Sequence, residues 1–203
     1  MAALVLAAIG YQLVTGLRDR PGFSLVNFLS FFTILSNLVA AAALILAARP
    51  GSRPAWLDRL RAASVLYLAS TGLVFATLLA DLPVELQLTV PWVDTVLHRV
   101  APVLVVLDWL LDPPRHRLRV TDAAAALVPP LVWTGYTLLR GPIVDWYPYP
   151  FLDPRPDGYP GVALTCVLVA AGMAGLAALV VWAGNRLAAH RSQPAGGPPR
   201  GGG

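Results

Sequence analysis

Six apolar segments, each roughly 20 residues long, constrain this chain more than any other feature of its sequence. They cover residues 2–17, 25–48, 62–81, 93–111, 121–139 and 161–184. About 20 apolar residues in a helix cross the hydrocarbon core of a bilayer, and a helix satisfies its own backbone hydrogen bonds there. We therefore expect an all-α fold, a polytopic integral membrane bundle of six transmembrane helices, or five if the first segment is not a span.

The composition agrees with a membrane protein and excludes several kinds of site. Of the 203 residues, 57% are hydrophobic and only 13% are charged, whereas a soluble domain is about 25% charged. Cys166 is the single cysteine, which excludes an intramolecular disulfide and a cysteine-based metal cluster. Every cation is an arginine, so no lysine can form a Schiff base or act as a nucleophile. The richness in arginine, alanine and proline is typical of a GC-rich bacterial genome.

Loop charge alternates along the chain and predicts a topology. The strongly basic segments are residues 49–61, residues 112–120 and the tail after Gly184. The weakly charged or acidic loops between them are residues 18–24, 82–92 and 140–160. The positive-inside rule places the basic segments in the cytoplasm, so with six spans both termini of this cell-membrane protein are cytoplasmic. The arginines then mark topology and not a nucleic-acid interface.

The chain is expected to form one domain. Residues 1–190 hold all of the apolar segments and predict a single transmembrane bundle, whereas residues 191–203 are rich in glycine and proline and predict a disordered cytoplasmic tail. The sequence contains no phosphate-binding loop, zinc-protease motif or serine-hydrolase elbow. It predicts neither a cofactor nor a metal site, and it leaves the oligomeric state open.

The second apolar segment carries a stripe of polar residues. On a helical wheel, Asn27, Ser30, Thr33 and Asn37 fall within roughly a 120° sector, and Ser36 lies beside it. Such residues usually bond neighbouring helices, and a hydroxyl can also bond a carbonyl of its own helix. Helix-to-helix bonding therefore accounts for most of the stripe. It accounts less well for Asn37, because a buried amide needs several partners.

Ionisable residues gather on one face of the fourth segment. These are Asp94, His98, Asp108 and Asp112, and His98 is the only histidine in any of the six segments. Charged groups inside a membrane usually face a cavity or a partner. Pro102 removes the amide that would bond the carbonyl of His98, which predicts a kink. Alternatively, His98 and Asp108 are structural and bond the polar groups of other helices.

Depth connects these two segments. Both begin at the outer face, so Thr33 lies roughly 12 Å and His98 roughly 8 Å inward at 1.5 Å per residue. A threonine hydroxyl becomes a nucleophile when a base removes its proton, and imidazole suits that task. Asp94, one turn before His98, would orient the imidazole as the third member of a triad. Asn37 or a loop amide would stabilise an oxyanion.

An aromatic and proline-rich loop lies above the same leaflet. The stretch WYPYPFLDPRPDGYPG carries Trp146, Tyr147 and Tyr149, which suit an aromatic belt at the membrane interface. Its prolines fix the backbone, which also suits a rigid lid over an outward-facing pocket. Both interpretations stay open.

A resemblance to a known family rests on three stretches: FFTILSN (31–37), LHRVAPVLVVLDW (97–109) and DWYPYPFLDP (145–154). Together they resemble the bacterial branch of the androgen-induced-protein family of multi-pass membrane proteins. Animal members are threonine hydrolases that cleave fatty-acid esters of hydroxy fatty acids with an intramembrane threonine and histidine. The resemblance implies that Thr33 and His98 are that pair. It gives Asp94 no role.

Three functions follow from these patterns. The first is an intramembrane hydrolase of lipid-like esters, with membrane lipids as its surroundings and Thr33 and His98 as nucleophile and base. The second is a non-catalytic transporter or small-molecule-binding membrane protein, in which Asp108 and His98 form an ion or proton site at the centre of the bundle. The third is a structural membrane protein whose polar residues only hold helices together.

Overall fold

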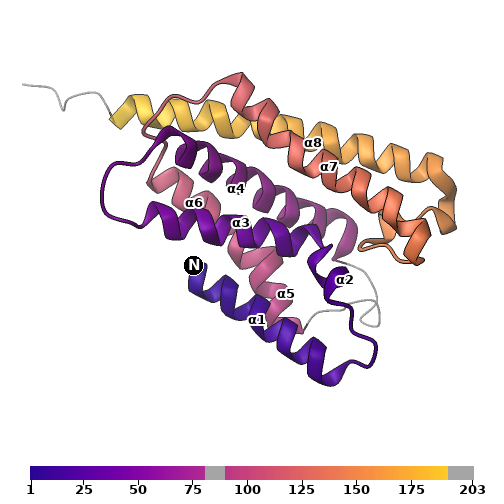
Figure 1. Ribbon diagram of the computed structural model, residues 1–203. Helices are drawn as coiled ribbons and strands as arrows, with labels where there is room; N and C mark the ends of the chain where they lie inside the picture. Colours follow the sequence, from indigo (N-terminus) through magenta and orange to yellow (C-terminus); the bar gives the residue numbers. More distant parts are fainter. Residues whose placement is uncertain (81–89, 192–203) are drawn as a thin grey trace, which may run out of the picture.

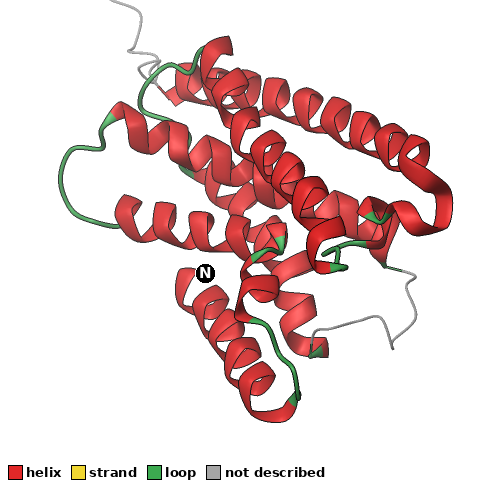
Figure 2. Cartoon of the chain, turned by 45° about the vertical axis from the view of Figure 1, so that its right-hand side comes forward, coloured by secondary structure: helices red, strands yellow, loops and turns green. Residues whose placement is uncertain are grey.

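The computed structural model describes residues 1–80 and 90–191, except the side chain of Asp157. Within these ranges the chain forms helices joined by loops and has no strand, which confirms the all-α prediction (Figure 2). The tail from residue 192 onward, predicted to be disordered, and most of the acidic loop 82–92 lie outside the described residues.

Most of the described residues in each apolar segment lie in helices (Figure 1). The α-helices are α1 (Ala2–Asp19), α2 (Leu25–Leu29), α3 (Phe32–Ala47), α4 (Ala55–Val74), α5 (Pro91–Thr95), α6 (Ala101–Leu111), α7 (Val120–Val144) and α8 (Pro154–Arg191, kinked at Gly158). The π turn η1 (Phe75–Leu79) extends α4, and a second π turn, η3 (Val96–Val100), joins α5 to α6. A 3-10 turn, η4 (Pro150–Leu152), precedes α8.

Among the residues that the structure describes, two helices are long and apolar enough to cross a membrane, judged by length and composition. They are Ala55–Leu79, which includes the π turn, and Gly158–Arg191; Phe32–Ala47 is apolar but shorter. The all-α fold therefore stands, whereas six transmembrane spans stay a prediction.

The helices pack in layers around α4. Helix α4 contacts α3, α6 and α8, while α7 lies along α8 and α1 lies against α3 (Figure 1). The main hydrophobic core joins α1, α3, α4 and the α5–α6 rod through small and branched residues such as Ala8, Ala40 and Leu68. A second cluster, which includes Leu66, Tyr67 and Met173, packs α4 against α8. Side chains on α4 thus face both layers of the molecule.

The second apolar segment is not one helix, so the single polar stripe drawn on a helical wheel is wrong. Helix α2 ends at Leu29, Phe31 has extended backbone angles, and α3 begins at Phe32. Neither glycine nor proline causes the break. Distant side chains satisfy the freed backbone groups: the indole of Trp133 donates to the Ser30 carbonyl at 2.9 Å, and the Thr33 amide donates to the Tyr149 hydroxyl at 3.1 Å.

The fourth segment is one helical rod with a π turn in its middle. The π turn η3 is marked by a bond from an amide to the carbonyl five residues earlier, which Ala101 makes with Val96. The next such bond would join Pro102 to Leu97, but proline has no N–H. The Leu97 carbonyl instead accepts from Asn37 Nδ2 at 3.3 Å. The helix is thus irregular beside His98 in the form of a π turn, whereas the predicted kink stays a prediction. Asn37 satisfies the Leu97 carbonyl.

Candidate active site

Thr33 lies at the amino-terminal end of α3, where backbone amides lack partners within the helix. The extended residue Phe31 precedes the helix and provides no side-chain cap. Instead, the Tyr149 hydroxyl oxygen accepts from the Thr33 amide at 3.1 Å and lies 3.1 Å from Thr33 Oγ1. Thr33 is 5% exposed, so its hydroxyl is shielded from bulk solvent.

The structure brings Thr33, His98 and Asp94 together. Thr33 Oγ1 lies 3.1 Å from His98 Nε2, and on the other side of the ring Asp94 Oδ1 lies 2.9 Å from Nδ1. The Asp94 carboxylate lies at ion-pair distance from Nδ1, and among the described residues Nδ1 has no hydrogen-bond partner. The order hydroxyl, imidazole, carboxylate is that of a nucleophile, its base and an orienting acid.

Neighbouring helices hold the His98 ring in place. The ring stacks on Phe75 with centroids 4.4 Å apart and planes at 15°. Helix α4 approaches the helix of His98 and Pro102 closely at Gly72. A Cβ atom added to Gly72 would lie 3.0 Å from Pro102 Cβ and 3.4 Å from the His98 carbonyl oxygen. A glycine at this position therefore lets α4 and the His98 rod approach closely, and Phe75, one turn later, reaches the imidazole.

Tyr149 is the site residue that sequence reasoning missed. It follows Pro148 and precedes η4, and its ring stacks on Phe151 at 5.3 Å and lies 5.9 Å from Trp133. Burial raises the pKa of its phenol, although the bond to Thr33 opposes that shift, so the hydroxyl keeps its proton. The sequence feature that could have pointed to Tyr149 is the aromatic and proline-rich loop that contains it. Because Tyr149 contacts Thr33 and lines the cavity, a lid describes this residue better than an aromatic belt at the membrane interface.

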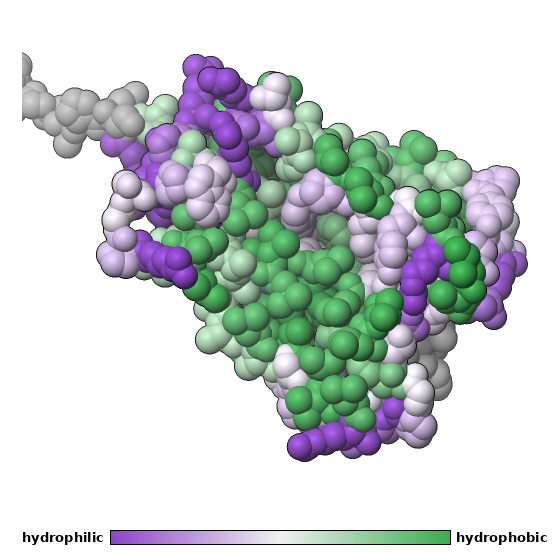
Figure 3. Space-filling view, in the orientation of Figure 1, coloured by the Kyte–Doolittle hydropathy of each residue, from purple (hydrophilic) through white to green (hydrophobic). Residues whose placement is uncertain are grey.

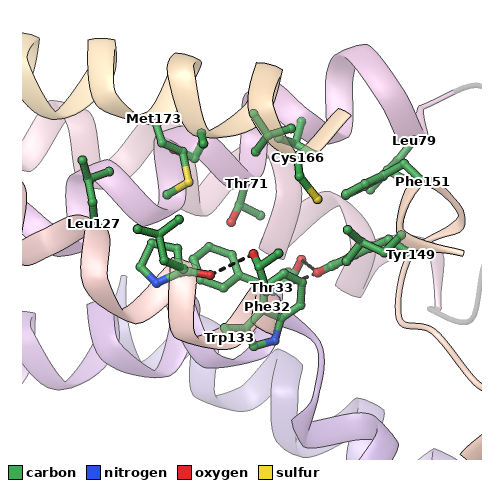
Figure 4. Close-up of a pocket in the computed structure, with 18 of the residues that line it drawn as sticks. Phe32, Thr33, Thr71, Leu79, Leu127, Trp133, Tyr149, Phe151, Cys166 and Met173 are labelled. Atoms are coloured by element: carbon green, nitrogen blue, oxygen red, sulfur yellow. Dashed lines mark hydrogen bonds between the residues drawn. The ribbon is translucent and has the colours of Figure 1, made fainter. Parts of the chain in front are cut away.

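Thr33, His98 and Tyr149 face a mostly apolar cavity of about 170 Å³ (Figure 4). Leu127 and Met173 line one end of it, and Phe151 and Leu79 line the other. Cys166 and Met173 reach it from α8, so the walls come from both layers of the molecule. The cavity can hold an apolar chain beside the Thr33 hydroxyl.

The other polar residues of the second segment bond helices and backbone groups. Asn27 Oδ1 accepts from Arg140 at 2.6 Å, the hydroxyls of Ser30 and Tyr136 lie 2.9 Å apart, and Ser36 donates to the Thr33 carbonyl.

Asn37 is not placed as an oxyanion donor. Its Nδ2 donates to the carbonyls of Thr33 and Leu97, and Asn37 does not line the cavity. It instead ties the helix that carries Thr33 to the turn that carries His98.

Asp108 belongs to a different part of the molecule. Its Oδ2 accepts from the buried Arg61 at 2.6 Å, and it lies ten residues beyond His98, or about 15 Å along the helix. Arg61 also donates to the Asp112 carbonyl, and Arg53 bonds the Asp112 carboxylate. Asp108 therefore does not share the predicted ion site with His98, and it instead bonds a polar group of another helix, as the structural alternative expects.

Among the described residues, no group of three or more His, Cys, Asp or Glu side chains is placed to hold a metal ion. Comparison of the chain with protein-family models, with curated proteins and with solved structures gave no match in any of the three. The geometry of the site therefore carries the functional argument.

Proposed function

We propose that the protein is an intramembrane hydrolase of lipid-like esters in which Thr33 is the nucleophile and His98 the general base. One observation carries the proposal: Thr33 Oγ1 lies 3.1 Å from His98 Nε2 at the wall of an apolar cavity, with Asp94 behind the imidazole. The resemblance to the androgen-induced-protein family implies the same threonine and histidine, and it is part of the proposal.

The proposal places the chain in the cell membrane with six spans. Large apolar side chains point outward over much of the molecule, and soluble proteins rarely expose such continuous surface. Examples are Leu4, Val14 and Leu17 of α1, Leu131, Val132 and Leu139 of α7, and Leu164, Val167 and Leu168 of α8. Figure 3 shows hydrophobic residues across the middle of one face and hydrophilic ones toward its edges. A hydrocarbon environment would cover this surface.

The chemistry needs only groups of this chain and water. Thr33 Oγ1 forms a bond to the ester carbonyl carbon while its proton passes to His98 Nε2, and the carbonyl electron pair moves onto oxygen. When the intermediate collapses, the bond to the alkoxy group breaks and His98 returns the proton to that leaving oxygen. Water then attacks the carbonyl carbon of the acyl-threonine while His98 Nε2 takes its proton. When this second intermediate collapses, the bond between that carbon and Thr33 Oγ1 breaks, His98 returns the proton to Oγ1, and the carboxylic acid leaves.

The cavity favours an ester with an acyl chain. Its lining is apolar at both ends, and Thr33 lies between Leu127 and Phe151 (Figure 4). An ester placed at Thr33 would therefore extend one apolar arm toward Leu127 and Met173 and the other toward Phe151 and Leu79. Each buried methylene contributes about 0.8 kcal/mol, so such arms supply most of the binding energy.

The transporter hypothesis lacks an observation in its favour. It requires Asp108 and His98 to share an ion or proton site, but Asp108 pairs with Arg61 and His98 pairs with Thr33 and Asp94.

A fluorophosphonate probe tests the proposal on the purified full-length protein. We expect the probe to label the wild-type protein, and Thr33→Ala and His98→Gln to abolish labelling. Thr134→Ala is the matched control, because Thr134 lines the same cavity but its hydroxyl donates to the Pro130 carbonyl at 2.9 Å. Labelling that survives in both Thr33→Ala and His98→Gln would contradict the assignment. Wild-type protein that never labels and hydrolyses no ester in a lipid panel would favour the non-catalytic hypothesis.

A further inference from the structure

Tyr149 is the cavity-lining phenol that contacts the nucleophile directly. Its hydroxyl lies 3.1 Å from Thr33 Oγ1 and 3.1 Å from the Thr33 amide nitrogen. The phenol reaches this position from a loop 116 residues away, and aromatic contacts with Phe31, Trp133 and Phe151 fix its ring. A residue held in this way at the reacting atom has a defined geometry before any substrate binds.

The protons of this group can be assigned from its neighbours. The Thr33 amide donates to the Tyr149 oxygen, so the phenol proton is free to point elsewhere. With a basic Nε2 on His98, the Thr33 proton points to the imidazole, and the Tyr149 proton then points to Thr33 Oγ1. Before substrate binds, the Tyr149 hydroxyl thus donates to Thr33 Oγ1, and the Thr33 hydroxyl donates to His98 Nε2. The same arrangement leaves Nδ1 protonated and facing Asp94.

We propose that Tyr149 is a catalytic residue whose hydroxyl donates a hydrogen bond to the oxyanion formed when Thr33 attacks an ester. This role rests on the proposed function. As Thr33 Oγ1 forms its bond to carbon, its lone pair no longer accepts from Tyr149, and the phenol proton turns to the carbonyl oxygen. That oxygen gains the electron pair of the carbonyl bond, and Tyr149 keeps its proton throughout.

The surroundings of Tyr149 support a donor role. Its oxygen lies at the amino-terminal end of α3, where the aligned backbone dipoles favour negative charge. Other polar groups near the site are engaged elsewhere: Asn37 Nδ2 bonds two carbonyls, and Thr134 bonds the Pro130 carbonyl. Ser70 is the competing donor, because its buried hydroxyl lines the cavity without a partner. Within the part of the chain that the structure describes, Ser70 Oγ makes no hydrogen bond to Thr33, whereas the Tyr149 hydroxyl makes two.

Hydrolysis of a p-nitrophenyl acyl ester and of its thionoester, by the full-length protein in detergent, tests this role. Sulfur accepts hydrogen bonds weakly, so an enzyme with a strong oxyanion donor prefers the oxygen ester. We expect Tyr149→Phe to lower kcat for the oxygen ester about 10²- to 10³-fold with little change in KM. We expect the thionoester rate to change much less, so that the oxygen-to-sulfur rate ratio falls.

Two variants serve as controls. Tyr136→Phe removes a nearby phenol hydroxyl that contacts Ser30 and not Thr33, and it should leave the rate ratio unchanged. Ser70→Ala should also leave the ratio unchanged. The role of Tyr149 is overturned if Tyr149→Phe retains full kcat, if it lowers both rates equally, or if Ser70→Ala lowers the ratio instead. A wild-type protein that hydrolyses neither ester and resists the fluorophosphonate overturns the proposed function together with this role.

Discussion

Thr33 differs from the polar residues near it in what it contacts, not in its chemical type. Ser30 bonds a backbone carbonyl of its own helix, and Ser36 bonds the Thr33 carbonyl, which is what membrane helices usually do with hydroxyls. Ser30 also contacts the Tyr136 phenol, whereas Thr33 Oγ1 contacts an imidazole as well as a phenol. The contact with an imidazole makes this hydroxyl the candidate nucleophile among the polar residues of the second apolar segment.

Asp94→Asn tests whether the carboxylate behind His98 has an electrostatic role. Asparagine keeps the shape but removes the charge, and its amide can donate to Nδ1, which places the ring proton on Nε2, facing Thr33. We expect kcat for ester hydrolysis to fall about 10²-fold or more with little change in folding. Asp145→Asn is the control, because that carboxylate is 86% exposed and pairs with Arg155 in the loop. An Asp94→Asn variant with wild-type kcat would remove Asp94 from the site.

At the scale of helices, the sequence predicted the helical segments but not the break that places Thr33 in the first turn of α3. Apolar length alone locates the helices, and Pro102 signalled the irregularity beside His98. The break at Phe31 has no local signal, because the groups that satisfy it, Trp133 and Tyr149, lie more than 100 residues away. Counting residues along each segment predicted similar membrane depths for Thr33 and His98. Whether the two side chains face each other depends on how the helices pack, which the residue count does not contain.

One face of α8 is expected to set the acyl-chain length that the cavity accepts. Cys166, Val169, Ala170 and Met173 line the cavity at helical spacing, and Met173 lies near its far end (Figure 4). Met173→Trp should fill that end and shift the preferred ester to a shorter chain, whereas Met173→Ala should shift it to a longer one. Each methylene that no longer fits should lower kcat/KM about fourfold, since its burial contributes about 0.8 kcal/mol.

The chain-length profile of kcat/KM over a series of p-nitrophenyl esters measures this effect. Leu168→Trp is the matched control, because Leu168 lies on the same helix but is 63% exposed and does not line the cavity. Its profile should equal that of the wild type. If both Met173 variants kept the wild-type profile, the acyl chain would have to lie elsewhere.

Over the whole molecule, the two ends of the bundle are built differently. At one end, Arg53, Asp58, Arg61 and Asp112 tie the start of α4 to the end of α6. Burial there opposes the ionisation of Asp112, but the hydrogen bond from Arg53 and the charges of Arg61, Arg53 and Arg115 outweigh it and lower its pKa. At the other end, the loop before α8 brings Tyr149 to Thr33. The ion pairs at the charged end therefore join α4 to α6, and the candidate active site lies toward the opposite end.

The proposed topology predicts that these ends face different compartments. With Cys166 replaced by alanine, Pro156→Cys probes the end near Tyr149 and Ser52→Cys probes the basic end, and both positions are exposed. Because basic loops stay in the cytoplasm, an impermeant maleimide should label Pro156→Cys in intact cells and Ser52→Cys only after lysis. The opposite pattern would invert the topology and place Thr33 near the cytoplasmic leaflet, so its ester substrate would have to come from that side. Labelling of both in intact cells would contradict a membrane barrier between the two ends.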